Sequence, residues 1–130
     1  MPRAYTVATA AVALSVPAKW IDNALSHHKV AGITQQRQGI PRRLTIDGLL
    51  VLSVALSLTA DLGSSLGNAL EIARDLVVGA GSLQTSNAIS IKIDLQSLKD
   101  RLLSRLEHAV EVAPLPRRGR PPKNTTGRLE

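Results

Sequence analysis

The chain has almost no aromatic residues from which to build a core. Phenylalanine is absent from its 130 residues, and Tyr5 and Trp20 are its only tyrosine and tryptophan. The core must therefore consist of leucine, valine, isoleucine and alanine, which favours small, mostly helical packing. At this length we expect one folded domain with tails. Because cysteine is also absent, disulfides, thiolate metal sites and a cysteine nucleophile are excluded.

Positive charge is concentrated at the two ends of the sequence. Residues 1–43 contain six basic residues and one acidic residue, and residues 114–130 contain five basic residues and one acidic residue. Residues 44–113 between them contain five basic and eight acidic residues. A net charge of +6 that is divided in this way predicts two anion-contacting segments around an apolar scaffold, with double-stranded nucleic acid as the leading partner.

Two apolar stretches raise the question of a membrane or an export signal. The uncharged run from Gly48 to Ala60 has 13 residues, fewer than the roughly 20 that span a bilayer, so it predicts a buried helix. Residues 4–18 loosely resemble a signal peptide, but the polar residues and helical periodicity in this stretch favour a folded helix. We therefore expect a cytoplasmic, nucleoid-associated protein with no membrane contact.

The first 44 residues predict a helix-turn-helix followed by a β-hairpin. Apolar residues at spacings of three and four predict helices at 7–14, capped by Thr6, and at 17–27, with Pro17 in the first turn. Residues 15–17 form the tight turn between them. Strands are expected at 30–34 and 40–44, around a polar turn at 35–39, and Pro41 suits an edge strand.

The remaining sequence predicts three more helices and one strand. A helix should run from Thr45 to Leu62, with Asp47 in its first turn and Gly63 after its end, and another from Ser64 or Ser65 to Gly79. A polar connector at 82–87, a strand at 88–93 and a leucine-striped helix starting at Asp94 follow. That last helix either closes the monomer core or forms a seam between two copies, and the strand's simplest partner is the same strand of a second copy.

Two parts of the first half carry a family resemblance. Tyr5-Thr6-Val7, Ala11, Ser15-Val16-Pro17 and Ile21, followed by the segment from Ile40 to Asp47, resemble the MerR-type winged helix-turn-helix. The resemblance covers about residues 5–65 and implies a mainly α fold in which the second helix is the recognition helix. Together with the charge distribution and the leucine stripe, it leads us to expect a DNA-binding domain with supporting helices (1–81), a strand and helix for dimerisation (82–113) and a basic tail (114–130).

The resemblance and the residue chemistry together give the candidate DNA contacts. Lys19 and Asn23 lie four residues apart on one face of the recognition helix, where Asn pairs with adenine and Lys reaches guanine or phosphate, unless both are ordinary solvated residues. Trp20 is expected in the core, and cations at the end of this helix either favour its negative terminus or contact phosphate. The full set outside the tail is Thr6, Lys19, Asn23, His28, Lys29, Arg37, Arg42 and Arg43.

The tail contains a second resemblance. Pro116 to Lys123 resembles an AT-hook, whose Arg-Gly-Arg-Pro core lies in the narrow minor groove of A·T-rich DNA. The implied contacts are Arg117, Arg118, Gly119, Arg120 and Lys123. The alternative is a solubilising tail, and in either case no packed structure is expected after Pro114.

These features favour a dimeric, sequence-specific transcription regulator. No nucleophile elbow, phosphate loop, paired-carboxylate pocket or metal-ligand spacing is present in the sequence, so we expect no enzymatic activity and no cofactor. Two other hypotheses remain open: an architectural protein that coats A·T-rich DNA, and an antitoxin-like repressor whose C-terminal half binds another protein.

Overall fold

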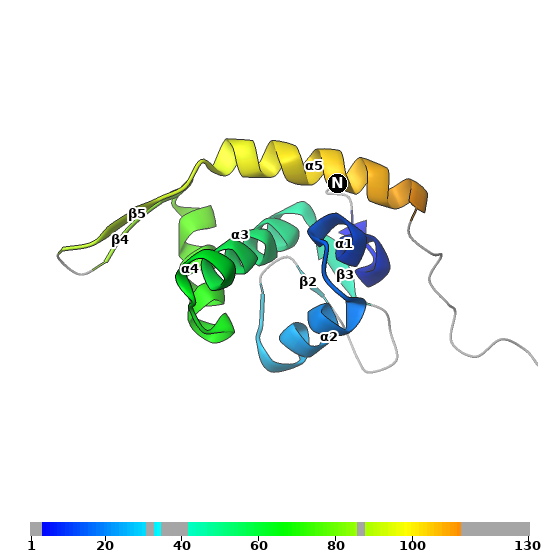
Figure 1. The fold of residues 1–130 in the computed structure, drawn as a ribbon, viewed down its shortest axis with the longest axis horizontal. Coiled ribbons are helices and arrows are strands. Elements are labelled where there is room, and N and C mark those ends of the chain that lie inside the picture. Colours follow the sequence, from blue (N-terminus) through cyan, green and yellow to red (C-terminus); the bar gives the residue numbers. More distant parts are fainter. Residues whose placement is uncertain (1–3, 31–32, 35–41, 86–87, 113–130) are drawn as a thin grey trace, which may run out of the picture.

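The computed structural model describes residues 4–30, 33–34, 42–85 and 88–112, which form a mainly helical protein with two small antiparallel sheets (Figure 1). The expected mainly α fold is therefore confirmed. The helices are α1 (Val7–Leu14), α2 (Ala18–His27), α3 (Ile46–Leu62), α4 (Leu66–Val78) and α5 (Leu95–Val112). The strands are β1 (Ala4–Tyr5), β2 (Ile33–Thr34), β3 (Arg43–Thr45), β4 (Ser82–Gln84) and β5 (Ser90–Lys92).

The first two helices follow the prediction, except at Pro17. The Thr6 hydroxyl accepts a hydrogen bond from the Thr9 amide at 3.1 Å, and α1 ends at Leu14, followed by the C-cap Ser15 with a left-handed φ of 59°. Pro17 has an extended backbone and lies immediately before α2 rather than inside its first turn. Its carbonyl accepts a bond from the Trp20 amide at 3.0 Å, so the residue acts as the N-cap of the helix.

The first sheet has the strand order β1-β3-β2. Leu44 in the central strand pairs with Tyr5 on one side and Ile33 on the other, and its side chain is fully buried. Both predicted strands are present within the described parts of their ranges, and β3 continues to Thr45, while residues 31–32, the turn at 35–39, Ile40 and Pro41 lie outside the described residues. Strand β1 was not expected, because two residues carry no alternation that a sequence pattern reveals.

Helices α3 and α4 begin and end where their capping residues predict. The Thr45 hydroxyl accepts from the Gly48 amide at 3.3 Å, and Gly63 ends α3 with a φ of 68° that a side chain would disfavour. The Ser65 hydroxyl caps α4 by accepting from the Asn68 amide at 3.3 Å. Gly79 follows the last residue of α4, as expected.

The strand predicted at 88–93 is present as β5, but the prediction that 82–87 is only a polar connector is wrong. Residues 82–84 form β4, which pairs with β5 in the same chain so that Leu83 lies opposite Ile91. Gly81 makes this hairpin possible for two reasons. Its φ of 96° is one that residues with a side chain rarely adopt, and a Cβ atom at this position would lie only 2.7 Å from the Ile93 carbonyl oxygen. The strand was missed because Leu83 is its only apolar residue, and no second copy is needed to pair β5.

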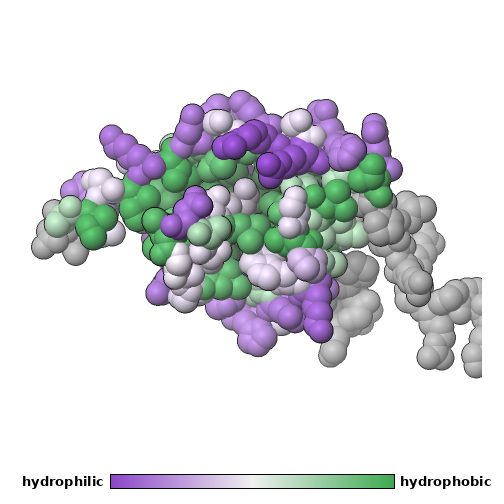
Figure 2. Space-filling model, viewed as in Figure 1, coloured by the Kyte–Doolittle hydropathy of each residue, from purple (hydrophilic) through white to green (hydrophobic). Residues whose placement is uncertain are grey.

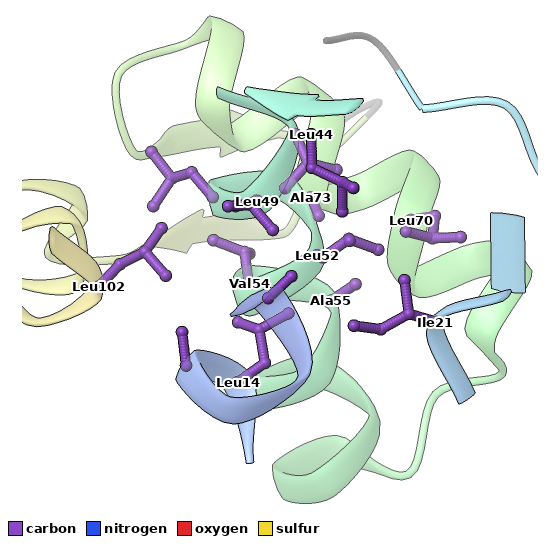
Figure 3. Packing of buried hydrophobic residues seen from close by; sticks show 14 of the residues in the cluster. Leu14, Ile21, Leu44, Leu49, Leu52, Val54, Ala55, Leu70, Ala73 and Leu102 are labelled. Carbon is purple, nitrogen blue, oxygen red and sulfur yellow. The ribbon is translucent and has the colours of Figure 1, made fainter. Parts of the chain in front are cut away.

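Helix α3 lies at the centre of one hydrophobic core to which all five helices contribute (Figure 3). Ile21 of α2, Leu70 of α4 and Leu14 of α1 pack around it. Trp20 is half-buried and packs against the same cluster, so its expected place in the core is confirmed. The core includes residues from both segments 1–81 and 82–113.

The leucine stripe of α5 closes this core. Leu102, Leu106 and Ala109 are buried, and α5 packs mainly on α1 and also on α3. The first of the two alternatives for the stripe therefore applies, and any seam with a second copy must use a different face of α5. Within the described residues, no helix combines the length and apolar character needed to cross a membrane.

Candidate nucleic-acid interface

Helix α2 has one buried face and one polar face. Ile21 and Ala24 are buried in the core, whereas Lys19 and Asn23 are exposed on the opposite side, one turn apart. Neither the Lys19 ammonium nor the Asn23 amide forms a hydrogen bond or ion pair with another described residue. The structure thus brings these two predicted site residues together, with their polar groups available to a ligand.

Two polar side chains at the end of α2 form hydrogen bonds with carbonyl groups of the same helix. The Ser26 hydroxyl donates to the Asp22 carbonyl at 2.7 Å, and His27 Nδ1 donates to the Asn23 carbonyl at 2.8 Å. Lys19 and Asn23, the two residues that the sequence singled out, are therefore the polar side chains on this face without a partner in the part of the chain that the structure describes.

Arg42 fixes α2 against the base of the β2–β3 hairpin. Its Nη1 lies 2.9 Å from Asp22 Oδ1 and its Nη2 donates to Ser26 Oγ at 3.3 Å, while its side chain is only 16 % exposed. The DNA contact expected of Arg42 stays a prediction, and its guanidinium already has two protein partners, Asp22 and Ser26. The ion pair also neutralises Asp22, which would otherwise place an uncompensated negative charge beside Lys19 and Asn23.

Arg43 has the opposite environment. Side chains alternate along β3, so Arg43 is exposed while Leu44 is buried. Arg43 therefore remains available as a phosphate contact at the base of the hairpin. Arg37, predicted at the hairpin tip, lies outside the described residues.

Thr6 is occupied by its capping role. Its hydroxyl accepts from the Thr9 amide and donates its one proton to Thr9 Oγ1 at 3.0 Å. The DNA contact expected of Thr6 stays a prediction, and its hydroxyl proton is already used within the protein.

His28 and Lys29 meet helix α4 after the end of α2. A cavity of about 220 Å³ is lined by these two residues together with Gly67, Glu71 and Arg74. His28 is half-buried and its Cε1 would lie 3.4 Å from a Cβ placed at Gly67. His28 therefore packs against α4, and its DNA contact stays a prediction, while Lys29 is exposed.

Arg74 is a candidate contact that the sequence analysis missed. It is exposed and lines the same cavity as Lys29, although the two are far apart in sequence. Among the described residues its ion-pair partner is Asp75, with Nε 3.6 Å from Oδ1, a weak surface contact. No sequence pattern reveals this pairing of cations, because it depends on how α4 packs beside the end of α2.

The remaining predicted contacts, Arg117, Arg118, Gly119, Arg120 and Lys123, lie outside the described residues. Among the residues that are described, no cluster of three or more His, Asp or Glu side chains could hold a metal ion. No family model, no curated protein and no solved structure matches the chain. Its function is therefore inferred from its own residues.

Proposed function

We propose that the chain is a transcription regulator that binds double-stranded DNA, with α1 and α2 as a helix-turn-helix and β2–β3 as the base of its wing. The observation that carries the proposal is the exposed polar face of α2, where Lys19 and Asn23 have no partner among the described residues while Arg42 holds the helix in place. Helix α2 has ten residues and is about 15 Å long, a size that the major groove admits. Asn23 would pair with an adenine edge, and Lys19 with guanine or phosphate.

Cations on neighbouring elements suit the DNA backbone. Arg43 at the hairpin base and Lys29 and Arg74 beside the end of α2 are exposed and would contact phosphates on either side of the groove. Arg37, which the sequence predicts at the hairpin tip and which lies outside the described residues, would add a contact. These contacts position the protein, whereas α2 selects the sequence.

Replacing Asn23 or Lys19 by alanine should weaken binding to the preferred site by about 5- to 150-fold, because each removes a base contact worth about 1–3 kcal/mol. Binding to a scrambled duplex should change little. Fluorescence anisotropy with labelled duplexes measures both affinities, and Ser104→Ala on the distant helix α5 is the control. Equal losses on both duplexes would assign these residues to the backbone and favour the architectural hypothesis.

Breaking the Arg42–Asp22 pair should also weaken binding to the preferred site. Asp22→Asn removes a negative charge and on simple electrostatics should strengthen DNA binding, but it releases Arg42 and loosens α2. We therefore expect lower specific affinity for Asp22→Asn and for Arg42→Gln, and a double variant no worse than Arg42→Gln alone. Additive losses in this double-mutant cycle, measured by anisotropy, would mean that Arg42 contacts DNA directly.

Deleting residues 114–130 should leave the melting temperature nearly unchanged, because this segment has no apolar pattern that would pack on the core. The deletion should lower the affinity for DNA, because it removes five cations. If the tail enters the minor groove, the loss should be larger for sites flanked by A-tracts than for G·C-flanked sites. The pair Arg118→Ala and Arg120→Ala should reproduce most of that difference. Equal losses on both flanks would reduce the tail to a non-specific anchor.

We further propose that the regulator is a homodimer that uses the outer flank of α5. Leu103 and Val110 lie seven residues apart, on the same side of the helix, and are 37 % and 44 % exposed. They are apolar side chains that the monomer core does not use. This surface replaces the buried leucine stripe as the proposed contact between copies.

A further inference from the structure

A second cavity lies between α1, α3 and α5. Its volume is about 460 Å³, within the range of sites that bind small molecules. Helices α5 and α2 lie on opposite sides of the molecule (Figure 1), so this cavity is remote from the proposed DNA-binding face. We call it the α3–α5 groove.

Polar side chains from two helices line this groove. Ser53, Ser57 and Asp61 are spaced four residues apart, so they form one polar stripe on α3, whose other faces supply eight buried residues. Arg101 and Arg105, also four residues apart, line it from α5. Figure 2 shows the hydrophilic side chains of α5 along the edge of the molecule, above more apolar surface.

The charged groups in the groove are not paired with each other. The lining holds two arginines and two aspartates. Asp94 Oδ1 accepts a hydrogen bond from the Ser97 amide at 3.0 Å, whereas Asp61, Arg101 and Arg105 make no ion pair or hydrogen bond with another described residue. Two like charges at a spacing of four residues repel each other by a few tenths of a kcal/mol on a helix. The groove therefore holds two neighbouring guanidinium groups for which a bound anion would be a favourable partner.

The remaining lining indicates what kind of anion fits. Leu98 and Leu102 of α5 and Ala13 of α1 provide an apolar wall. The hydroxyls of Ser53 and Ser57 and the free carboxylate of Asp61 accept hydrogen bonds from a donor group. Guanidinium groups favour carboxylates because they bind both oxygens in one plane.

We propose that the α3–α5 groove binds a small amphipathic carboxylate that also carries a hydroxyl or ammonium group, as amino acids and hydroxy acids do. Arg101 and Arg105 bind the carboxylate, Asp61 and the serines accept from the donor group, and the apolar wall contacts the carbon skeleton. Ligand binding in this groove requires no residue of the proposed DNA-binding face.

The position of the groove gives the ligand a route to α2. Ala13 and Leu14 line the groove and are the last two residues of α1, directly before the turn that leads into α2. A ligand that packs against them would alter the orientation of the recognition helix. This regulatory part rests on the proposed function, whereas binding in the groove does not.

The test is a titration of the full chain, without DNA, followed by two-dimensional amide NMR. The probes are L-leucine, L-phenylalanine and 4-hydroxybenzoate, each compared with its primary amide, which lacks the carboxylate charge. We expect saturable shifts for at least one acid and at least tenfold weaker binding of its amide. If no acid binds, or if acids and amides bind equally, the proposed site is wrong.

Variants locate the site. Arg105→Gln should weaken the acid at least tenfold, whereas Lys92→Gln, which removes the same charge from strand β5, should not. A thermal melt shows whether both variants are folded. If the acid binds Arg105→Gln as tightly as the wild type, the assignment of the site is wrong. If Arg105→Gln differs from the wild type in mass by sedimentation, the groove is an interface between copies and the assignment is also wrong. Ligand binding that leaves DNA affinity unchanged would overturn only the coupling to α2.

Discussion

Raising the salt concentration from about 50 to 200 mM should weaken binding of this chain to duplex DNA by roughly 500-fold. Each neutralised phosphate adds about 0.9 to the slope of the logarithm of affinity against the logarithm of salt concentration, and about five contacts give a slope near −4.5. The exposed cations Lys29, Arg43 and Arg74 are positioned for such contacts, and the basic tail supplies others.

Anisotropy titrations at several salt concentrations measure this slope. Lys29→Gln and Arg43→Gln should each make it shallower by about 0.9, while Lys92→Gln on strand β5 should leave it unchanged. An affinity that hardly varied with salt would contradict a role for the basic residues in binding DNA.

Replacing Leu102 by aspartate should destabilise the monomer by more than about 4 kcal/mol, enough to unfold much of a small domain. Leu102 is 3 % exposed and lies where α5 packs on the body of the protein, as Figure 3 shows. The substitution removes leucine packing, which alone is worth about 2–5 kcal/mol, and places a carboxylate in an apolar site. Urea unfolding followed by circular dichroism measures the loss.

The neighbouring residue provides a matched control. Leu103 is on the outer flank of α5, so Leu103→Asp should change the free energy of unfolding by less than about 1 kcal/mol. In analytical ultracentrifugation the same variant, or Val110→Asp, should shift a homodimer towards monomer. A stable, folded Leu102→Asp protein would contradict the packing of α5, and a wild-type protein that stays monomeric at tens of micromolar would contradict the dimer.

The helices were predictable because their ends are marked locally. Thr6, Thr45, Ser65 and Asp94 each accept a hydrogen bond from an amide in the first turn of the following helix, and such residues stand out in a sequence. The apolar stripe of α5 was also evident. The surface against which this stripe packs was not evident. Periodicity shows which face of a helix is buried but not whether the same chain or a second copy covers that face.

The features that escaped prediction are short or depend on tertiary contacts. Strands β1 and β4 have two and three residues, too few for an alternating pattern. The Arg42–Asp22 pair joins residues 20 positions apart, so only the folded structure reveals that Arg42 has protein partners. For the same reason Lys19 and Asn23, which share one helix, were identified from sequence, whereas Arg74 was not.

The central claim is that α2 reads base edges in duplex DNA, and selection from a pool of random duplexes tests it most directly. After several rounds with the purified full chain, sequencing should show one enriched motif containing a conserved adenine. Selection with Asn23→Ala should lose the preference at that adenine while retaining the rest of the motif. A bound pool with the same base composition as the input pool would contradict sequence-specific recognition by α2.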